Sequence, residues 1–72
     1  MEKKLRSYLE ILQEKSEKLE VPLSDAFAWK DIADSTYYRT INGQTELRYK
    51  TAYLVNLSLE ELYALRKHRE SL

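Results

Sequence analysis

The chain has 72 residues, no cysteine, and equal numbers of basic and acidic side chains, twelve of each. A domain of this length buries only about 60% of the surface that its unfolded chain exposes, so a deep catalytic cleft is not expected. The lack of cysteine excludes disulfides and thiolate metal sites. The balanced charge counts against a nucleic-acid binder, because such domains are usually basic. No stretch is long and apolar enough for a membrane span or a signal peptide, which favours a cytoplasmic protein without membrane partners.

One glycine and one proline in the whole chain leave few signals for sheets or long loops, whereas good helix formers are plentiful. The sequence therefore predicts an all-α fold. Its first helix is expected over residues 2–19, where Leu5, Leu9, Leu12 and Leu19 form one apolar stripe. Pro22 ends this helix, because the residue before a proline is pushed out of the helical region.

Two short helices are expected next. Ser24 is a candidate N-cap for a helix over residues 25–30. Asp31 marks a turn, since aspartate tolerates the left-handed conformation better than most residues. Asp34 or Ser35 would cap the following helix.

That second short helix reaches about Asn42, where Asn42-Gly43 is a strong stop signal. A fourth helix is expected over residues 46–56 and a fifth over residues 59–69, opened by a capping box of Ser58 and Glu61. The prediction is a single domain over residues 1–72, a small bundle of about five helices.

Residues suited to catalysis are scarce. His68 is the only histidine and lies in a charged run near the predicted end of the last helix, where it suits the helix dipole. One histidine cannot supply the ligand set that a metal needs. Asp31 and Asp34 are better explained as a turn residue and a cap than as paired acids. The sequence predicts no enzyme, no metal site, no cofactor and no small-molecule substrate.

Residues 26–43 are the most informative segment. They comprise a short apolar helix, a tight turn at Lys30-Asp31-Ile32, a polar helix start at Asp34-Ser35-Thr36, then Arg39 and the stop at Asn42-Gly43. This order resembles the helix-turn-helix of the phage repressor and Cro-like family, without gaps. The turn glycine of the family is Asp31 here, and the usual small alanine of its first helix is Phe27.

The resemblance extends over roughly the last two thirds of the chain, because residues 56–62 are similar to the family's common ending. It implies a helix-turn-helix over residues 24–43, preceded by an amphipathic helix over 1–20 and followed by supporting helices over 46–70. The function that it implies is sequence-specific binding of double-stranded DNA by a small transcriptional regulator of phage or prophage origin.

In such motifs the second helix enters the major groove with its N-terminal residues at the base edges. The family register turns Ile32, Tyr37 and Ile41 inward. It implies that the residues at the base edges are Ala33, Ser35, Thr36, Tyr38, Arg39 and Asn42. Arginine can bind guanine, and asparagine adenine, through two hydrogen bonds.

The following loop and helix start usually bind phosphate in this family, which here implies Gln44, Thr45, Arg48 and Lys50. One short helix reads only a few base pairs, and a homodimer on two half-sites is the usual solution. Either terminal helix is a candidate interface for it. The balanced charge and amphipathic terminal helices leave a second hypothesis open, a protein-interaction module or antirepressor built on a helical bundle, which would expose an apolar patch of several hundred Å².

Overall fold

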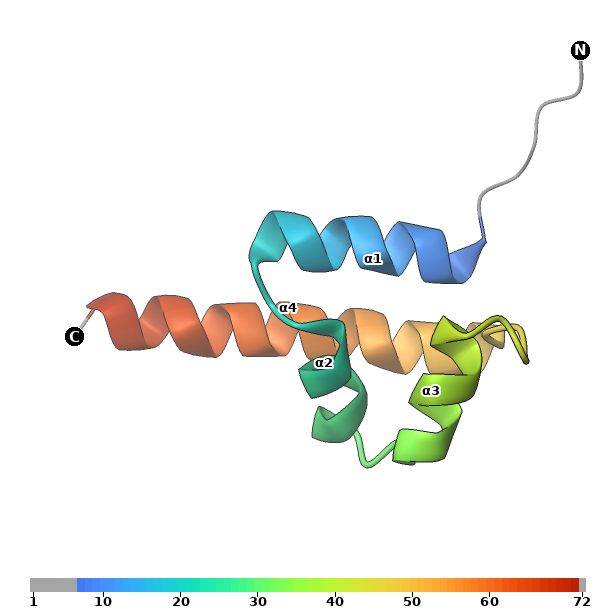
Figure 1. Ribbon diagram of the computed structural model, residues 1–72. Coiled ribbons are helices and arrows are strands. Elements are labelled where there is room, and N and C mark those ends of the chain that lie inside the picture. Colours follow the sequence, from blue (N-terminus) through green and yellow to red (C-terminus); the bar gives the residue numbers. More distant parts are fainter. Residues whose placement is uncertain (1–6, 72) are drawn as a thin grey trace, which may run out of the picture.

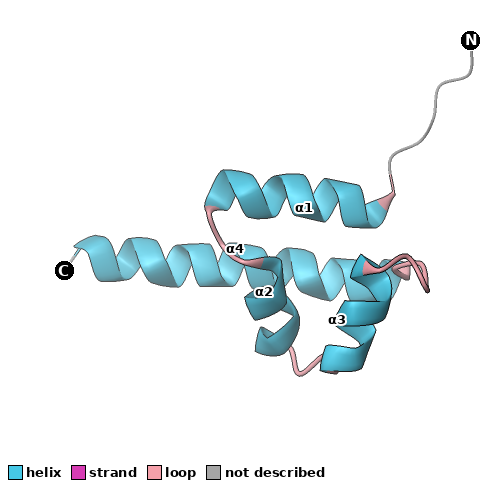
Figure 2. Cartoon of the chain, viewed as in Figure 1, coloured by secondary structure: helices cyan, strands magenta, loops and turns pink. Residues whose placement is uncertain are grey.

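The computed structural model describes residues 7–71, and every regular element in that range is a helix (Figures 1 and 2). The predicted all-α class is therefore confirmed. The number of helices is not, because residues 7–71 contain four helices instead of five: α1 (Tyr8–Leu19), α2 (Leu23–Trp29), α3 (Asp34–Ile41) and α4 (Tyr49–Ser71).

α1 begins at a capping box that the sequence interpretation missed. The Ser7 hydroxyl accepts a hydrogen bond from the Glu10 amide at 3.2 Å, and the Glu10 carboxylate accepts one from the Ser7 amide at 3.1 Å. The pattern Ser-x-x-Glu could have revealed this start. The predicted helix over residues 2–19 thus starts at Tyr8, and residues 2–6 lie outside the described residues.

The predicted caps of α2 and α3 are wrong. α2 starts at Leu23 after Pro22, so Ser24 lies inside the first turn. α3 starts at Asp34 after Ala33, and no side chain caps it. Asp34 and Ser35 are therefore exposed residues of the first turn.

α4 is one continuous helix where the sequence predicted two, over residues 46–56 and 59–69. Ser58 is completely buried, and its hydroxyl donates to the Leu54 carbonyl one turn earlier at 3.0 Å. Glu61, its expected partner in a capping box, accepts hydrogen bonds from the Trp29 indole at 2.8 Å and from Lys30 at 3.0 Å. A hydrogen bond within α4 thus accounts for Ser58, and contacts with Trp29 and Lys30 account for Glu61, instead of a helix start.

α1 and α4 pack side by side and run in the same direction, with both N-termini at one end (Figure 1). Three contacts along their length show this parallel register. The rings of Tyr8 and Tyr49 lie 6.0 Å apart, Lys15 donates to the Asn56 side chain at 2.7 Å, and Arg66 donates to the Leu19 carbonyl at 2.8 Å.

The hydrophobic core lies where α4 packs against α1 and α2, and it also includes the segments between helices. Residues from α1, α2 and α4 contribute to it, as do residues of the α1–α2 and α3–α4 connections. Its buried members are Leu12, Val21, Leu23, Ala26, Phe27, Leu47, Ala52, Val55 and Leu59.

Candidate nucleic-acid interface

The turn between α2 and α3 fixes how these two short helices follow one another. Asp31 adopts the predicted left-handed conformation, with φ of 58°. Its amide donates to the Ala28 carbonyl at 3.0 Å, and the Ile32 amide donates to the Phe27 carbonyl at 3.1 Å. This pair of bonds is the Schellman motif, which satisfies the last carbonyls of α2 without any side chain.

Phe27 anchors α3 to the core. Its side chain is buried, and its ring meets that of Tyr37 edge-on, with centroids 5.2 Å apart. The large side chain that departs from the family pattern is therefore accommodated by an aromatic contact between α2 and α3. Aromatic pairs in this arrangement contribute about 0.5–1.5 kcal/mol beyond the area that they bury.

The inward face of α3 differs from the expectation at one position. Ile32 and Tyr37 pack against the core as predicted, but Ile41 is exposed. The buried residue near the end of α3 is Thr40, whose hydroxyl donates to the Thr36 carbonyl at 2.8 Å. A threonine can occupy this buried position because the helix itself supplies the acceptor.

The residues expected at the base edges lie mainly on the exposed face of α3. Thr36 is half-buried, and the other five are exposed: Ala33, Ser35, Tyr38, Arg39 and Asn42. Tyr38 lies against Tyr37, with ring centroids 5.4 Å apart. The structure thus presents a polar, solvent-facing surface with one arginine near its centre.

α3 ends as the sequence predicted, at Asn42-Gly43. Gly43 has φ of 78°, its amide donates to the Thr40 carbonyl at 3.2 Å, and the Gln44 amide donates to the Arg39 carbonyl at 2.8 Å. These two bonds form another Schellman motif. They bring Gln44 back against the last turn of α3, next to the surface that carries Arg39.

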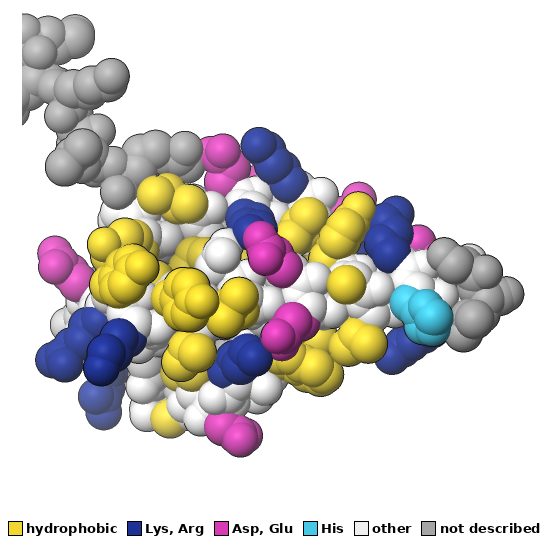
Figure 3. Space-filling model, turned by 180° about the vertical axis from the view of Figure 1, so that it is seen from behind, with side chains coloured by type: hydrophobic (Ala, Val, Ile, Leu, Met, Phe, Trp, Pro, Cys, Tyr) yellow, Lys and Arg dark blue, Asp and Glu magenta, His cyan; other side chains and the backbone are white. Residues whose placement is uncertain are grey.

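The four residues expected to contact phosphate, Gln44, Thr45, Arg48 and Lys50, are all exposed. Arg48 directly precedes α4, which starts three residues later than predicted. Among the residues that the structure describes, no ion pair involves Arg39, Arg48 or Lys50. Figure 3 shows a group of Lys and Arg side chains at the end of the molecule where α4 begins.

Acidic side chains lie close to this surface. Asp31, Asp34 and Glu46 are all exposed. Asp34 lies in the first turn of α3, where the helix dipole stabilises a negative charge. Because it caps no backbone amide, its carboxylate is available to solvent or to a ligand.

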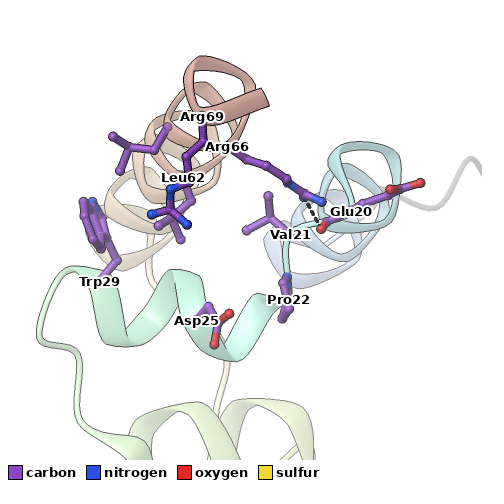
Figure 4. Close-up of a pocket in the computed structure, with 9 residues that line it drawn as sticks. Glu20, Val21, Pro22, Asp25, Trp29, Leu62, Arg66 and Arg69 are labelled. Atoms are coloured by element: carbon purple, nitrogen blue, oxygen red, sulfur yellow. Dashed lines mark hydrogen bonds between the residues drawn. The ribbon is translucent and has the colours of Figure 1, made fainter. Parts of the chain in front are cut away.

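An open groove of about 400 Å³ lies between the end of α1, α2 and the second half of α4 (Figure 4). Figure 4 shows Arg66 pointing toward Glu20, whose carbonyl accepts a hydrogen bond from it. Arg69 and Asp25 also line the groove, so its charges are mixed. None of the ten predicted DNA-contact residues lines it.

The sequence interpretation overlooked an exposed aromatic cluster on α1 and α4. Tyr49 and Tyr53 stack at 6.4 Å between ring centroids, and Tyr8 of α1 joins them. The spacing of four residues between Tyr49 and Tyr53 places both on one helix face. That spacing was the signal available in the sequence.

His68 is exposed near the end of α4, as expected for a solvated position. Residues 7–71 contain no group of three or more potential metal ligands. No helix in the same range combines the length and apolarity that crossing a membrane requires.

Comparison of the chain with protein-family models, curated proteins and solved structures found no match in any of the three.

Proposed function

We propose that this chain binds double-stranded DNA in a sequence-specific manner and acts as a small transcriptional regulator of phage or prophage origin. In this proposal α2, the turn at Asp31 and α3 form a helix-turn-helix, and α3 enters the major groove. Arg39 and Asn42 read base edges, while Arg48 and Lys50 bind the phosphate backbone.

The observation that carries the proposal is the exposed polar face of α3, held in place by packing on its other side. The contact of Tyr37 with Phe27 and the two Schellman motifs fix α3 at both ends. A recognition helix needs this combination, because base contacts are specific only when the helix cannot shift. Arg39, on this face, forms no ion pair with any described residue, so binding DNA would break no such pair.

Asp34 has a defined role in this proposal. A carboxylate near the groove repels phosphate, but it can accept a hydrogen bond from the amino group of cytosine. Since Asp34 does not cap α3, its carboxylate remains available for such a contact. It would then disfavour guanine and thymine, which offer no amino donor in the major groove, and raise specificity at the expense of affinity.

The test is selection of bound sequences from a pool of randomised duplexes, at two salt concentrations, with wild type, Arg39→Ala and Arg69→Ala. Arg69 is a matched control because it is also exposed and lies on α4, away from α3. Enrichment of a short motif, relaxed at one position only by Arg39→Ala, would support the proposal. Removing a base contact of this kind reduces discrimination by about 1–3 kcal/mol, or roughly 5- to 150-fold.

Absence of any enriched motif, together with equal affinities of wild type and Arg39→Ala, would refute the proposal. The second candidate function, a protein-interaction module or antirepressor, would then be preferred. One observation favours it, namely the exposed apolar side chains that gather on the face viewed in Figure 3.

A further inference from the structure

An exposed aromatic patch covers the N-terminal parts of α1 and α4. We define it by Tyr8, Ile11, Tyr49 and Tyr53, which are 45%, 46%, 65% and 52% exposed. Figure 3 shows hydrophobic side chains gathered on this side of the molecule, which faces away from the viewer in Figure 1. A shallow depression of about 200 Å³ lies at its centre, with Leu12 and Ala52 at its base.

The patch carries no charge. One third of the chain is charged, yet among residues 7–71 the depression is lined only by apolar residues, tyrosines and Asn56. Lys15, which donates to the lining residue Asn56 at 2.7 Å, is also paired with Glu60 at 2.6 Å. A partner that fits this surface must therefore be uncharged and apolar at its centre, since it would find no charge to pair with.

The size of the patch suits the centre of a small interface. A fully exposed tyrosine offers about 200 Å², so the four partly exposed side chains amount to roughly 350–400 Å². A typical stable interface buries about 800 Å² per partner, and in homodimers about 65% of that is apolar, or roughly 500 Å². The patch supplies most of this apolar area, and polar neighbours can supply the rim.

We propose that the partner is a second copy of this chain, related by a twofold axis through the aromatic patch. In such an interface the same surface faces itself, so an uncharged patch meets an uncharged patch and tyrosine rings meet tyrosine rings. The net charge of zero removes long-range repulsion between two copies. None of the ten predicted DNA-contact residues belongs to the patch, so the dimer leaves α3 accessible. The inference goes beyond the proposed function and does not depend on it.

The test is sedimentation equilibrium of the full chain without DNA, from about 1 to 500 µM. The variants are Ile11→Glu and Tyr53→Glu, which place a charge in the patch from α1 and from α4. The matched control is Leu65→Glu. Leu65 is 44% exposed and lies on α4, as Tyr53 does, but outside the patch. Circular dichroism of each variant checks that the helices remain folded.

We expect the wild type and Leu65→Glu to dimerise with similar dissociation constants, and each patch variant to raise that constant at least tenfold. A wild type that stays monomeric at 500 µM would overturn the inference. So would a dimer that tolerates both patch substitutions, or one that Leu65→Glu disrupts as strongly as they do. Because no DNA is present, none of these outcomes bears on the proposed DNA binding.

Discussion

The buried serine in the middle of α4 provides a sharp test of the fold. Ser58 lies inside a continuous helix, and its hydroxyl donates to the Leu54 carbonyl. In Ser58→Ala that carbonyl keeps its ordinary helix hydrogen bond, so no buried polar group is left without a partner. A hydrogen bond of this kind contributes about 0.5–1.5 kcal/mol net, and alanine recovers about 0.5 kcal/mol through its higher helix propensity. The free energy of unfolding should thus fall by less than about 1 kcal/mol.

The stability of Ser58→Gly distinguishes two possible structures of this region. One is the continuous helix, and the other is a pair of helices that meet at residue 58. Inside a helix, glycine is less stable than alanine by about 0.5–1 kcal/mol, because it loses more backbone entropy on folding. At an N-cap the order reverses, since glycine costs only a few tenths of a kcal/mol and alanine about 1 kcal/mol. The structure therefore predicts that Ser58→Ala is more stable than Ser58→Gly.

The assay is urea and thermal unfolding of both variants, with Ser7→Ala and Ser7→Gly as controls. Ser7 is the N-cap of α1, so the glycine variant should be the more stable one there. For a domain of this size 1 kcal/mol corresponds to about 4–8 °C in Tm, which is readily measured. If Ser58→Gly proves more stable than Ser58→Ala, the inference of one continuous α4 is refuted.

Three further predictions concern the end of α3, the contact between α2 and α4, and the proposed DNA interface. Gly43→Ala should lower the free energy of unfolding, measured with urea, by about 1–2 kcal/mol, because a φ of 78° strains any residue with a side chain. No atom lies within 4 Å of the added methyl, so the strain is confined to the backbone. An unchanged stability would contradict this. The hydrogen bond from Trp29 lowers the pKa of Glu61 below the ordinary 4.5, so wild type should exceed Glu61→Gln in stability at pH 7. This excess disappears as pH falls through the lowered pKa, and a gap that persists at pH 2 would refute the assignment. Replacing Arg48 and Lys50 by alanine should reduce the slope of log K against log salt by about 0.9 for each phosphate that the variant no longer neutralises, and an unchanged slope would exclude them from the interface.

Features set by a few neighbouring residues could be predicted from the sequence. The left-handed turn at Asp31 and the end of α3 at Gly43 depend on local backbone preference, and the structure has both. The capping box at Ser7 was equally local, but the apolar stripe that continued to Leu5 obscured it.

Features decided by distant contacts could not be predicted in this way. A serine followed three residues later by glutamate fits a helix start, but it also fits a helix interior in which the serine hydroxyl bonds the preceding turn. At Ser58 burial selects the second arrangement, while Glu61 bonds Trp29 at the end of α2 and Lys30 directly after it. The roles of Arg39, Asn42, Arg48 and Lys50 in DNA binding remain predictions, although all four side chains lie where DNA could reach them.

The parallel arrangement of α1 and α4 has a consequence for the order of folding. Two parallel helices cannot be joined by a tight loop, and here the contacts between them link residues 41 to 47 positions apart. Closing so long a segment costs entropy before any contact is made, whereas α2 and α3 meet through a short turn. We therefore expect α1 to dock after the rate-limiting step. Truncation of its buried Leu12 to alanine would then accelerate unfolding and leave the folding rate nearly unchanged.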